Sequence, residues 1–402
     1  MIKADYVHTL KEENVLDYIV ILPKKLDKNS NILVSMIDGT AREFDTNEDT
    51  IDITDNRLIY MAENANMPII IPVIKEWGNV IKPQGLKSEN LDNDETRNEY
   101  KKHLSKYTQL DPEVVNEEPQ LFEAYRNTII NAYKRLIDTQ VLNDRSESDY
   151  KIDLEGYSAQ GVKAQRLAML IPDMIRSVFV GGAISSIPIV DNNEIGLNYP
   201  IGFRNIYTIV GTEKNILPSY KQIFQNLYVS EYELEYKGNF EINGKPVSQH
   251  DKSPDVVEVV DKQVELFGED INNRVNEAIR MNLKNGCNIQ NYKIYKGTNH
   301  RSANTETIDD MFRVIDGLNR GQIIQLPKSA DRISTNSTHN CTKTNGVLSK
   351  DEEKKTKMAP VSIKDLQKNA IKQGITTEDV ENCDRIINSK DKEHDIQATI
   401  DD

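Results

Sequence analysis

One serine stands in a setting that suits nucleophilic chemistry. Ser158 lies in the run Gly156-Tyr157-Ser158-Ala159-Gln160-Gly161, between an apolar segment and a helical pattern at residues 162–170. Glycines at both ends of the run let neighbouring backbone approach closely, and the small Ala159 adds little bulk. A serine on such a strand–turn–helix unit takes strained backbone geometry with its hydroxyl exposed at the carboxyl end of a sheet. The following helix would direct its N-terminal amides at charge that develops there. An ordinary strand–helix turn would also place a serine here.

Buried strands and helices must position this serine. Apolar runs predict strands at residues 15–23, 32–37, 68–73, 152–157, 177–183, 226–233 and 291–295. Apolar residues at helical spacing predict helices at residues 58–63, 121–137, 162–170 and 307–315. The run Ile32-Leu33-Val34-Ser35-Met36-Ile37 is nearly all apolar, and an apolar run of this length is typical of a strand buried on both faces, as in a parallel sheet. The alternation of strands and helices predicts an α/β fold with a mostly parallel central sheet flanked by helices.

The stretch around Ser158 resembles the α/β-hydrolase fold, and within it the predicted bacterial esterases related to polyhydroxybutyrate depolymerases. The likeness rests on the serine turn together with Arg166-Leu167-Ala168, Pro172, Ile175-Arg176, Gly181-Gly182-Ala183 and Tyr199-Pro200-Ile201-Gly202. It extends over residues 15–320. The chain departs from the family pattern at Gln160, where the pattern has glycine, and at Asp38, where it has histidine.

The resemblance implies a Ser-His-acid triad that cleaves a carboxyl ester through an acyl-enzyme. Ser158 would be the nucleophile. His300 would be the general base, since it follows the last predicted strand, where the fold places its catalytic histidine. The backbone amides of Ala159 and Thr40 would hold the oxyanion. A surface loop histidine is the ordinary alternative for His300.

Glu233 is the first candidate for the acid. On the family pattern, the segment Ser230-Glu231-Tyr232-Glu233 puts Glu233 at the acid position. Glu231 points the opposite way if the strand persists, and it is the second candidate. Asp251 and Asp255 come third, in a turn-rich insertion that would fold over the site. Solvated loop acids on an acidic protein would also account for all four residues.

Composition limits the class of protein. The 402 residues carry a formal net charge of −14, which argues against a nucleic-acid surface. Cys287, Cys341 and Cys383 are widely spaced and form neither a disulfide framework nor a metal cluster, so no metal and no organic cofactor is expected. The first residues lack a signal-peptide pattern, and no run is apolar enough to span a membrane. A cytoplasmic protein is therefore expected.

The composition changes after Gly321. Residues 1–320 are expected to form the α/β-hydrolase domain, and residues 321–402 a polar, flexible tail with a short helix near 363–383. One predicted function is a serine esterase that acts on a small-molecule ester or acyl substrate. The other is a catalytically inactive α/β-hydrolase-like binding or scaffold protein, in which the tail would contact a protein partner. The departures at Asp38 and Gln160 favour the second function.

Overall fold

The chain divides into two compact units, Met1–Ala330 and Asp331–Asp402. The computed structural model describes, within the first unit, residues 2–9, 14–37, 39–40, 50–53, 55–74, 106–107, 110–183, 187–191, 195–211, 216–234, 241–242, 245–246, 264–268, 270–296, 303–326 and 329–330. The central sheet, its covering helices and the Ser158 turn all fall in these ranges. The predicted tail helix near 363–383 lies outside them.

Every strand and helix predicted within the described residues is present, with ends shifted by a few residues. The strands are β1 (Ile2–Val7), β2 (Asp17–Ile21), β3 (Ile32–Ser35), β4 (Gly39–Thr40), β5 (Thr50–Ile53), β6 (Ile69–Ile74), β7 (Ile152–Tyr157), β8 (Ile175–Gly181), β9 (Phe224–Ser230), β10 (Glu241–Ile242), β11 (Lys245–Pro246), β12 (Ile289–Tyr295) and β13 (Ser329–Ala330). The helices are α1 (Asn56–Asn64), α3 (Pro112–Glu117), α4 (Gln120–Asp138), α5 (Ala159–Leu170), α6 (Ile206–Val210), α7 (Ile216–Gln222), α8 (Glu231–Leu234), α10 (Ile271–Lys284) and α11 (Ala303–Asn319), with 3-10 turns η4 (Glu147–Asp149) and η5 (Pro172–Met174).

Among the described residues, eleven strands form one mixed sheet, in the order β13-β12-β9-β8-β7-β3-β6-β2-β1-β5, with β4 beside β6. Neighbours from β13 to β6 are parallel, whereas β2 is antiparallel to both β6 and β1, and β5 is antiparallel to β1. The predicted mostly parallel sheet is thereby confirmed. The chain passes from β3 to β6 and then back across β3 to β7. The carboxyl ends of β3 and β7 therefore flank a topological switch point, where open α/β sheets bind ligands.

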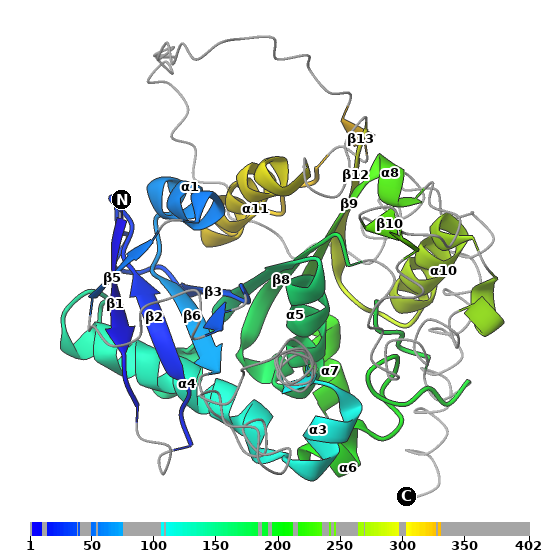
Figure 1. The fold of residues 1–402 in the computed structure, drawn as a ribbon, viewed down its shortest axis with the longest axis horizontal. Coiled ribbons are helices and arrows are strands. Elements are labelled where there is room, and N and C mark those ends of the chain that lie inside the picture. The colour runs from blue at the N-terminus through cyan, green and yellow to red at the C-terminus, as the bar shows by residue number, and fades with distance from the viewer. Residues whose placement is uncertain are drawn as a thin grey trace, which may run out of the picture. The chain divides into compact units, whose positions relative to one another are not determined.

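Helices cover both faces of this sheet (Figure 1). α1 and α11 lie over one face, where Met61 and Met311 pack with Ile71 of β6. α4, α5, α6, α7 and α10 cover the other face, where Leu167 of α5 packs in the same cluster as Leu154 of β7. Because side chains alternate along a strand, both faces of the central strands are buried. This explains the continuous apolar runs in the sequence.

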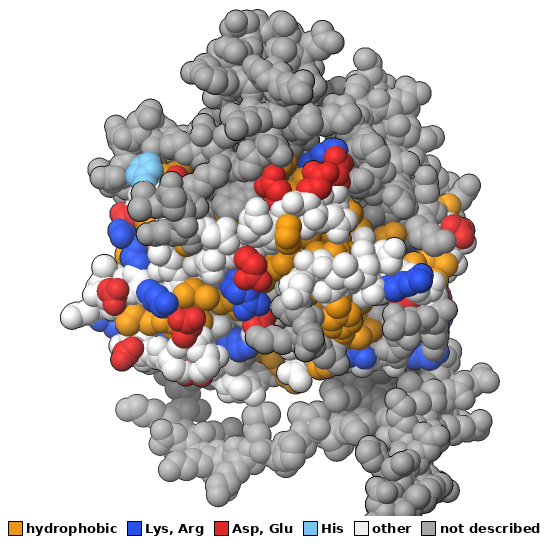
Figure 2. Space-filling view, turned by 90° about the horizontal axis from the view of Figure 1, so that it is seen from below, with side chains coloured by type: hydrophobic (Ala, Val, Ile, Leu, Met, Phe, Trp, Pro, Cys, Tyr) orange, Lys and Arg blue, Asp and Glu red, His pale blue; other side chains and the backbone are white. Residues whose placement is uncertain are grey.

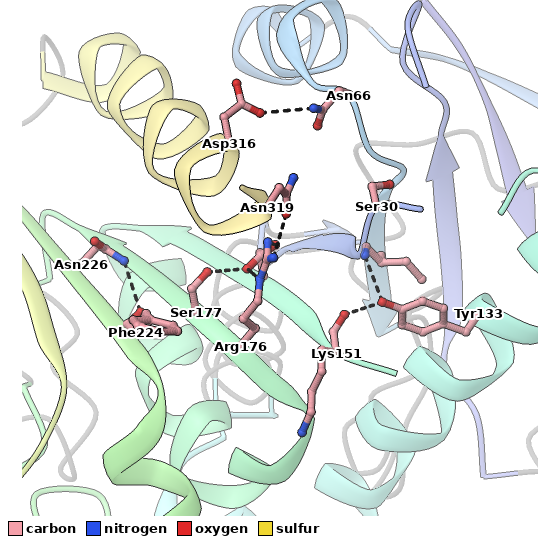
Figure 3. Close-up of polar contacts among 12 residues, drawn as sticks. Ser30, Asn66, Tyr133, Lys151, Arg176, Ser177, Phe224, Asn226, Asp316 and Asn319 are labelled. Carbon is pink, nitrogen blue, oxygen red and sulfur yellow. Dashed lines mark hydrogen bonds and ion pairs between the residues drawn. The ribbon is translucent and has the colours of Figure 1, made fainter. Parts of the chain in front are cut away.

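Tyr133 of α4 ties together the amino ends of β3 and β7. Its hydroxyl accepts a hydrogen bond from the Ile32 amide at 3.2 Å and donates one to the Lys151 carbonyl (Figure 3). The Tyr133 ring also stacks on Tyr150, with ring centroids 4.4 Å apart. The register of β3 against β7 is therefore fixed by a side chain at the sheet edge opposite Ser158.

The chain after α11 returns along β12. The Asn291 side chain donates a hydrogen bond to the Ile324 carbonyl at 3.1 Å and accepts one from the Leu326 amide at 2.7 Å. Further on, β13 pairs with the last two residues of β12. The side-chain amide of Asn291 thus forms the hydrogen bonds to this segment that the backbone of a paired strand would otherwise form.

Figure 2 shows one face of the molecule from below, with acidic and basic side chains interspersed among hydrophobic ones. On the coloured part of that face, which holds the described residues, neither sign of charge forms a large field. Within the described ranges, no helix combines the length and the apolar character needed to cross a bilayer.

Candidate active site

Ser158 joins β7 to α5 in a backbone conformation that serine rarely adopts. Its φ is 59° and its ψ is −127°. The amide of Ser158 donates to the Gly181 carbonyl of β8 at 2.7 Å, and its carbonyl accepts from the Gly161 amide at 2.9 Å. A non-glycine residue in such a region costs about 1–3 kcal/mol and persists only where its surroundings over-determine it. The turn is therefore held by the sheet on one side and by α5 on the other.

The glycines of the turn are required by space. A Cβ at Gly156 would lie 2.2 Å from the carbonyl oxygen of Gln160, and a Cβ at Gly161 would lie 2.8 Å from the Cβ of Ala183. These distances are far below van der Waals contact, so the first turn of α5 packs directly on the end of β7. The close approach expected from the sequence is confirmed at both positions.

Ser158 is only partly buried, and it lies at the carboxyl edge of the sheet. The positive end of the α5 dipole lies beside it, because α5 begins at the next residue. The amide of Ala159 donates to no acceptor in the part of the chain that the structure describes. This amide has the position of an oxyanion-hole donor in a serine turn.

Thr40 reaches the same sheet edge from β3. After β3, the Met36 amide still donates to the Glu155 carbonyl of β7 at 3.0 Å. The chain then turns away from β7 and forms β4 beside β6, with Thr40 opposite Ile74. A backbone donor from the segment between this strand and the first helix is the second element of the hydrolase oxyanion hole. Asp38 lies outside the described residues.

The expected acids follow β9, and here one sequence prediction was wrong. The strand was predicted to continue to Glu233, but β9 ends at Ser230 and Glu231–Leu234 forms the helical turn α8. Tyr228 is paired with Gly181, so the end of β9 lies at the same sheet edge as Ser158. The position of the Glu233 side chain is outside the description.

His300 lies between the last residue of β12 and the first residue of α11, in a segment outside the described residues, as do Asp251 and Asp255. Its two flanking elements are joined. The Tyr295 hydroxyl donates to Oδ2 of Asp310 at 2.5 Å, and Lys293 forms an ion pair with the same oxygen. β12 is parallel to β9, with Tyr295 opposite Ser230. The end of β12, from which the chain continues to His300, therefore lies at the same sheet edge as the end of β9, after which Glu231 and Glu233 follow in the sequence.

A buried carboxylate beside the serine turn was not found from the sequence. Glu155 of β7 is 1% exposed. Its Oε2 accepts from Nη2 of Arg57 at 2.5 Å, and its Oε1 accepts from the hydroxyl of Ser35. The available signal was an acidic residue inside a strand whose other residues at this end of the sheet are apolar or small. Its partners, from α1 and β3, could not be identified from spacing alone.

Cys287 does not compete as a nucleophile. Its side chain is 5% exposed at the end of α10. Burial is the largest effect on this thiol and raises its pKa to about 12. The reactive species of cysteine is the thiolate, so this residue stays unreactive near neutral pH.

No protein-family model matches the chain, and no curated protein matches it. Among solved structures it is similar to poly(aspartic acid) hydrolase-1 from Sphingomonas sp. KT-1, with 14% identity over 78% of this chain and 98% of that one and a TM-score of 0.46. It is also similar to a siderophore hydrolase from Aspergillus nidulans, with 10% identity over 78% and 93% of the two chains and a TM-score of 0.33. A dienelactone hydrolase from Anabaena variabilis gives 12% identity, 77% and 93% coverage and a TM-score of 0.32.

The sheet turns back across β3, and the strand beside β3 leads into a serine with positive φ at the start of a helix. Helices cover both faces of this mostly parallel sheet, so the chain has an α/β fold.

Proposed function

We propose that the protein is a serine hydrolase that cleaves carboxyl esters through an acyl-enzyme intermediate. The observation that supports this most is the Ser158 backbone, with φ 59° and ψ −127°, at the carboxyl end of β7. An ordinary strand–helix turn has no need of a serine in a conformation that costs about 1–3 kcal/mol. A nucleophile elbow does, because the strained turn presents the hydroxyl above the sheet.

In this proposal Ser158 attacks the acyl carbonyl while His300 takes its proton, and His300 then gives that proton to the leaving alcohol. The amides of Ala159 and Thr40 bind the oxyanion, and each such donor typically contributes about 3 kcal/mol to the transition state. Water then attacks the acyl-enzyme by the same route. Residues of the chain itself supply each of these groups.

Glu233 is proposed to orient His300 and to stabilise the imidazolium. Its place supports the proposal, because α8 begins directly at the end of β9 and β9 lies beside β12 in the sheet. Glu231 on the same helical turn is the second candidate. Asp251 and Asp255 follow as the third.

A catalytically inactive binding or scaffold protein is the second candidate function. Gln160 favours it, because this partly buried side chain stands two residues after Ser158, where the family pattern has glycine. Asp38 would add a carboxylate to the segment that precedes Thr40. Both residues would have to leave room for an anionic intermediate in an active enzyme.

Reaction with a fluorophosphonate probe and turnover of p-nitrophenyl acetate test the proposal. The wild-type protein should react with both, and Ser158→Ala should react with neither while it keeps its unfolding transition. Ser148→Ala, a change at an exposed serine of η4, is the matched control and should behave as the wild type. A folded wild-type protein that reacts with neither reagent between mildly acidic and basic pH would establish the scaffold function instead.

A further inference from the structure

β7 carries two buried carboxylates on one face, and each is held by one arginine and one serine. Asp153 is 0% exposed and Glu155 is 1% exposed. Because alternate residues of a strand share a face, both point to the side of the sheet that α1 and α11 cover. Asp153 bonds residues of β8, whereas Glu155 bonds residues of β3 and α1.

Asp153 joins β7 to β8 at the amino edge of the sheet. Arg176 donates to it twice, from Nε to Oδ1 at 2.9 Å and from Nη2 to Oδ2 at 2.5 Å, and Ser177 donates to Oδ1 at 2.5 Å. Figure 3 shows Arg176, Ser177 and Asn319 gathered there, where Arg176 also donates to Asn319 at 2.7 Å. This two-bond fork is the geometry expected of a stabilising pair.

Glu155 joins β7 to β3 at the carboxyl edge. Ser35 is its direct neighbour across the parallel ladder, and the Ser35 hydroxyl donates to Oε1. Arg57 of α1 donates one bond to Oε2, from Nη2 at 2.5 Å. Within the described ranges, the Nε of Arg57 is buried without a hydrogen-bond partner. Arg57 therefore does not form a bidentate pair with Glu155. One carboxylate oxygen, Oε2, bonds Arg57 of α1, and the other, Oε1, bonds Ser35 of β3.

The two strands separate at this point. The Glu155 backbone carbonyl also accepts from the Met36 amide at 3.0 Å, which is the last bond between β3 and β7 among the residues that the structure describes. Beyond it, β7 runs through Gly156 and leads to Ser158, and the segment after β3 leads to Thr40 of β4, which pairs with β6. The separation between the nucleophile and the Thr40 amide is set by where and how the strands diverge.

We infer that Glu155 is a positioning residue that sets the distance between the Ser158 nucleophile and the oxyanion donor contributed by Thr40. This inference rests on the proposed hydrolase function. A buried ion pair seldom stabilises a fold more than a well-packed apolar pair of the same volume. Oxyanion donors, by contrast, act only when they lie at hydrogen-bond distance from the developing charge. The Glu155 carboxylate is bonded by Ser35 of β3 and by Arg57 of α1, and these two contacts would fix the position of β7 relative to β3 just before the strands diverge.

Four variants test the inference: Glu155→Gln, Ser35→Ala, the double variant Glu155→Gln/Arg57→Leu, and the control Asp153→Asn. Glu155→Gln should lower kcat for p-nitrophenyl acetate at least tenfold with KM within twofold of wild type. The rate of fluorophosphonate inactivation should fall in parallel. Ser35→Ala should lower kcat by a smaller factor. Asp153→Asn should lower Tm but leave kcat within twofold, because its contacts lie at the far edge.

The double variant separates positioning from stability. Removing both charges should restore much of the Tm that Glu155→Gln loses, while kcat stays at the level of the single variant. The pH profile of kcat/KM should keep the apparent pKa of wild type, since the inferred role of Glu155 acts through β3 and β7 rather than through the base. The inference is overturned if kcat of Glu155→Gln stays within twofold of wild type, if Asp153→Asn lowers kcat equally, or if kcat recovers with Tm. A wild-type protein without esterase or probe reactivity would instead overturn the proposed function, and the inference with it.

Discussion

The hydroxyl of Tyr295 donates a hydrogen bond to Asp310 at 2.5 Å, which joins the end of β12 to α11 on either side of the segment with His300. Burial, followed by the charge of Asp310, raises the pKa of this hydroxyl far above its usual value. The hydroxyl therefore remains a donor at every pH at which the fold persists. Lys293 completes the cluster, with its ammonium group 4.5 Å from the centre of the Tyr295 ring.

Tyr295→Phe should lower the free energy of unfolding by about 1.5–3 kcal/mol, the range for a hydrogen bond to a charged group. Esterase activity should fall as well, because the segment with His300 loses one of its anchors. Tyr292→Phe on the same strand is the control. Within the described residues its hydroxyl is buried without a partner, so its removal should leave stability unchanged or raise it. Urea unfolding of both variants decides the matter, and equal losses would refute the role of the Tyr295 contact.

Ser158→Gly should be more stable than Ser158→Ala by about 1 kcal/mol, although both variants should be inactive. Alanine keeps the Cβ that disfavours φ 59°, whereas glycine adopts this conformation without strain. The strain that glycine relieves is partly offset by the greater freedom of glycine in the unfolded chain. Urea unfolding of the two variants side by side measures the difference. A glycine variant that is the less stable of the two would show that the serine turn is not strained.

Gly156→Ala should destabilise the protein by more than about 3 kcal/mol or prevent folding, because its Cβ would enter the backbone of α5. Gly286→Ala is the control. Gly286 has a φ of 83° and nothing within 4 Å of the added Cβ, so only backbone strain of about 1–2 kcal/mol applies. Thermal unfolding and soluble yield compare the two. A Gly156→Ala protein as stable as the control would mean that the turn can open without loss.

Asp173 provides a pH-dependent contact. Burial acts to raise the pKa of this carboxyl, but the hydrogen bonds and the charge of Arg126 outweigh burial and lower the pKa below its usual value. A lowered pKa in the folded state contributes stability above the unfolded pKa of about 3.9, and this contribution is lost as the pH falls through the folded value.

Asp173→Asn should therefore lower Tm at pH 7, and the difference from wild type should shrink as the pH falls below about 4. The loss should stay under about 1 kcal/mol, because the Asp173 side chain is 49% exposed and solvent screens the pair. Glu147→Gln removes an ion pair to Lys134 in which both side chains are 56% exposed, and it should change Tm little at either pH. A difference for Asp173→Asn that grows in acid would reverse the sign of this argument.

The central strands were predictable because burial on both faces leaves a simple record in the sequence. Residues 32–34 and Ile69–Ile74 are apolar throughout, and each lies in a strand between two other strands. The strand β1 and the edge strand β5 were not predicted. In Ile2–Val7, Lys3 and Asp5 interrupt the apolar pattern, and the strand depends on pairing with β2 and β5 rather than on its own composition.

The serine turn was predictable for a different reason, since its constraints are local. Gly156 and Gly161 lie next to the contacts that require them. Glu155 was missed because an acid that alternates with Ile152 and Leu154 is typical of a half-exposed strand, and Arg57 is far away in the sequence. The end of β9 was misjudged at Glu231 because a helical turn and a strand both accept the residues that follow Ser230.

The contacts between Asn291 and the chain after α11 affect the tendency of the protein to self-associate. An uncovered edge strand presents a row of unpaired amides and carbonyls that another chain can pair with, which leads to aggregation. Here Asn291 bonds Ile324 and Leu326, and β13 pairs with Ile294 and Tyr295, so the returning chain caps the open side of β12. A protein ended at residue 320 would lack this cap. Its colloidal behaviour would then suffer before its fold did, and solubility would fall steeply with concentration.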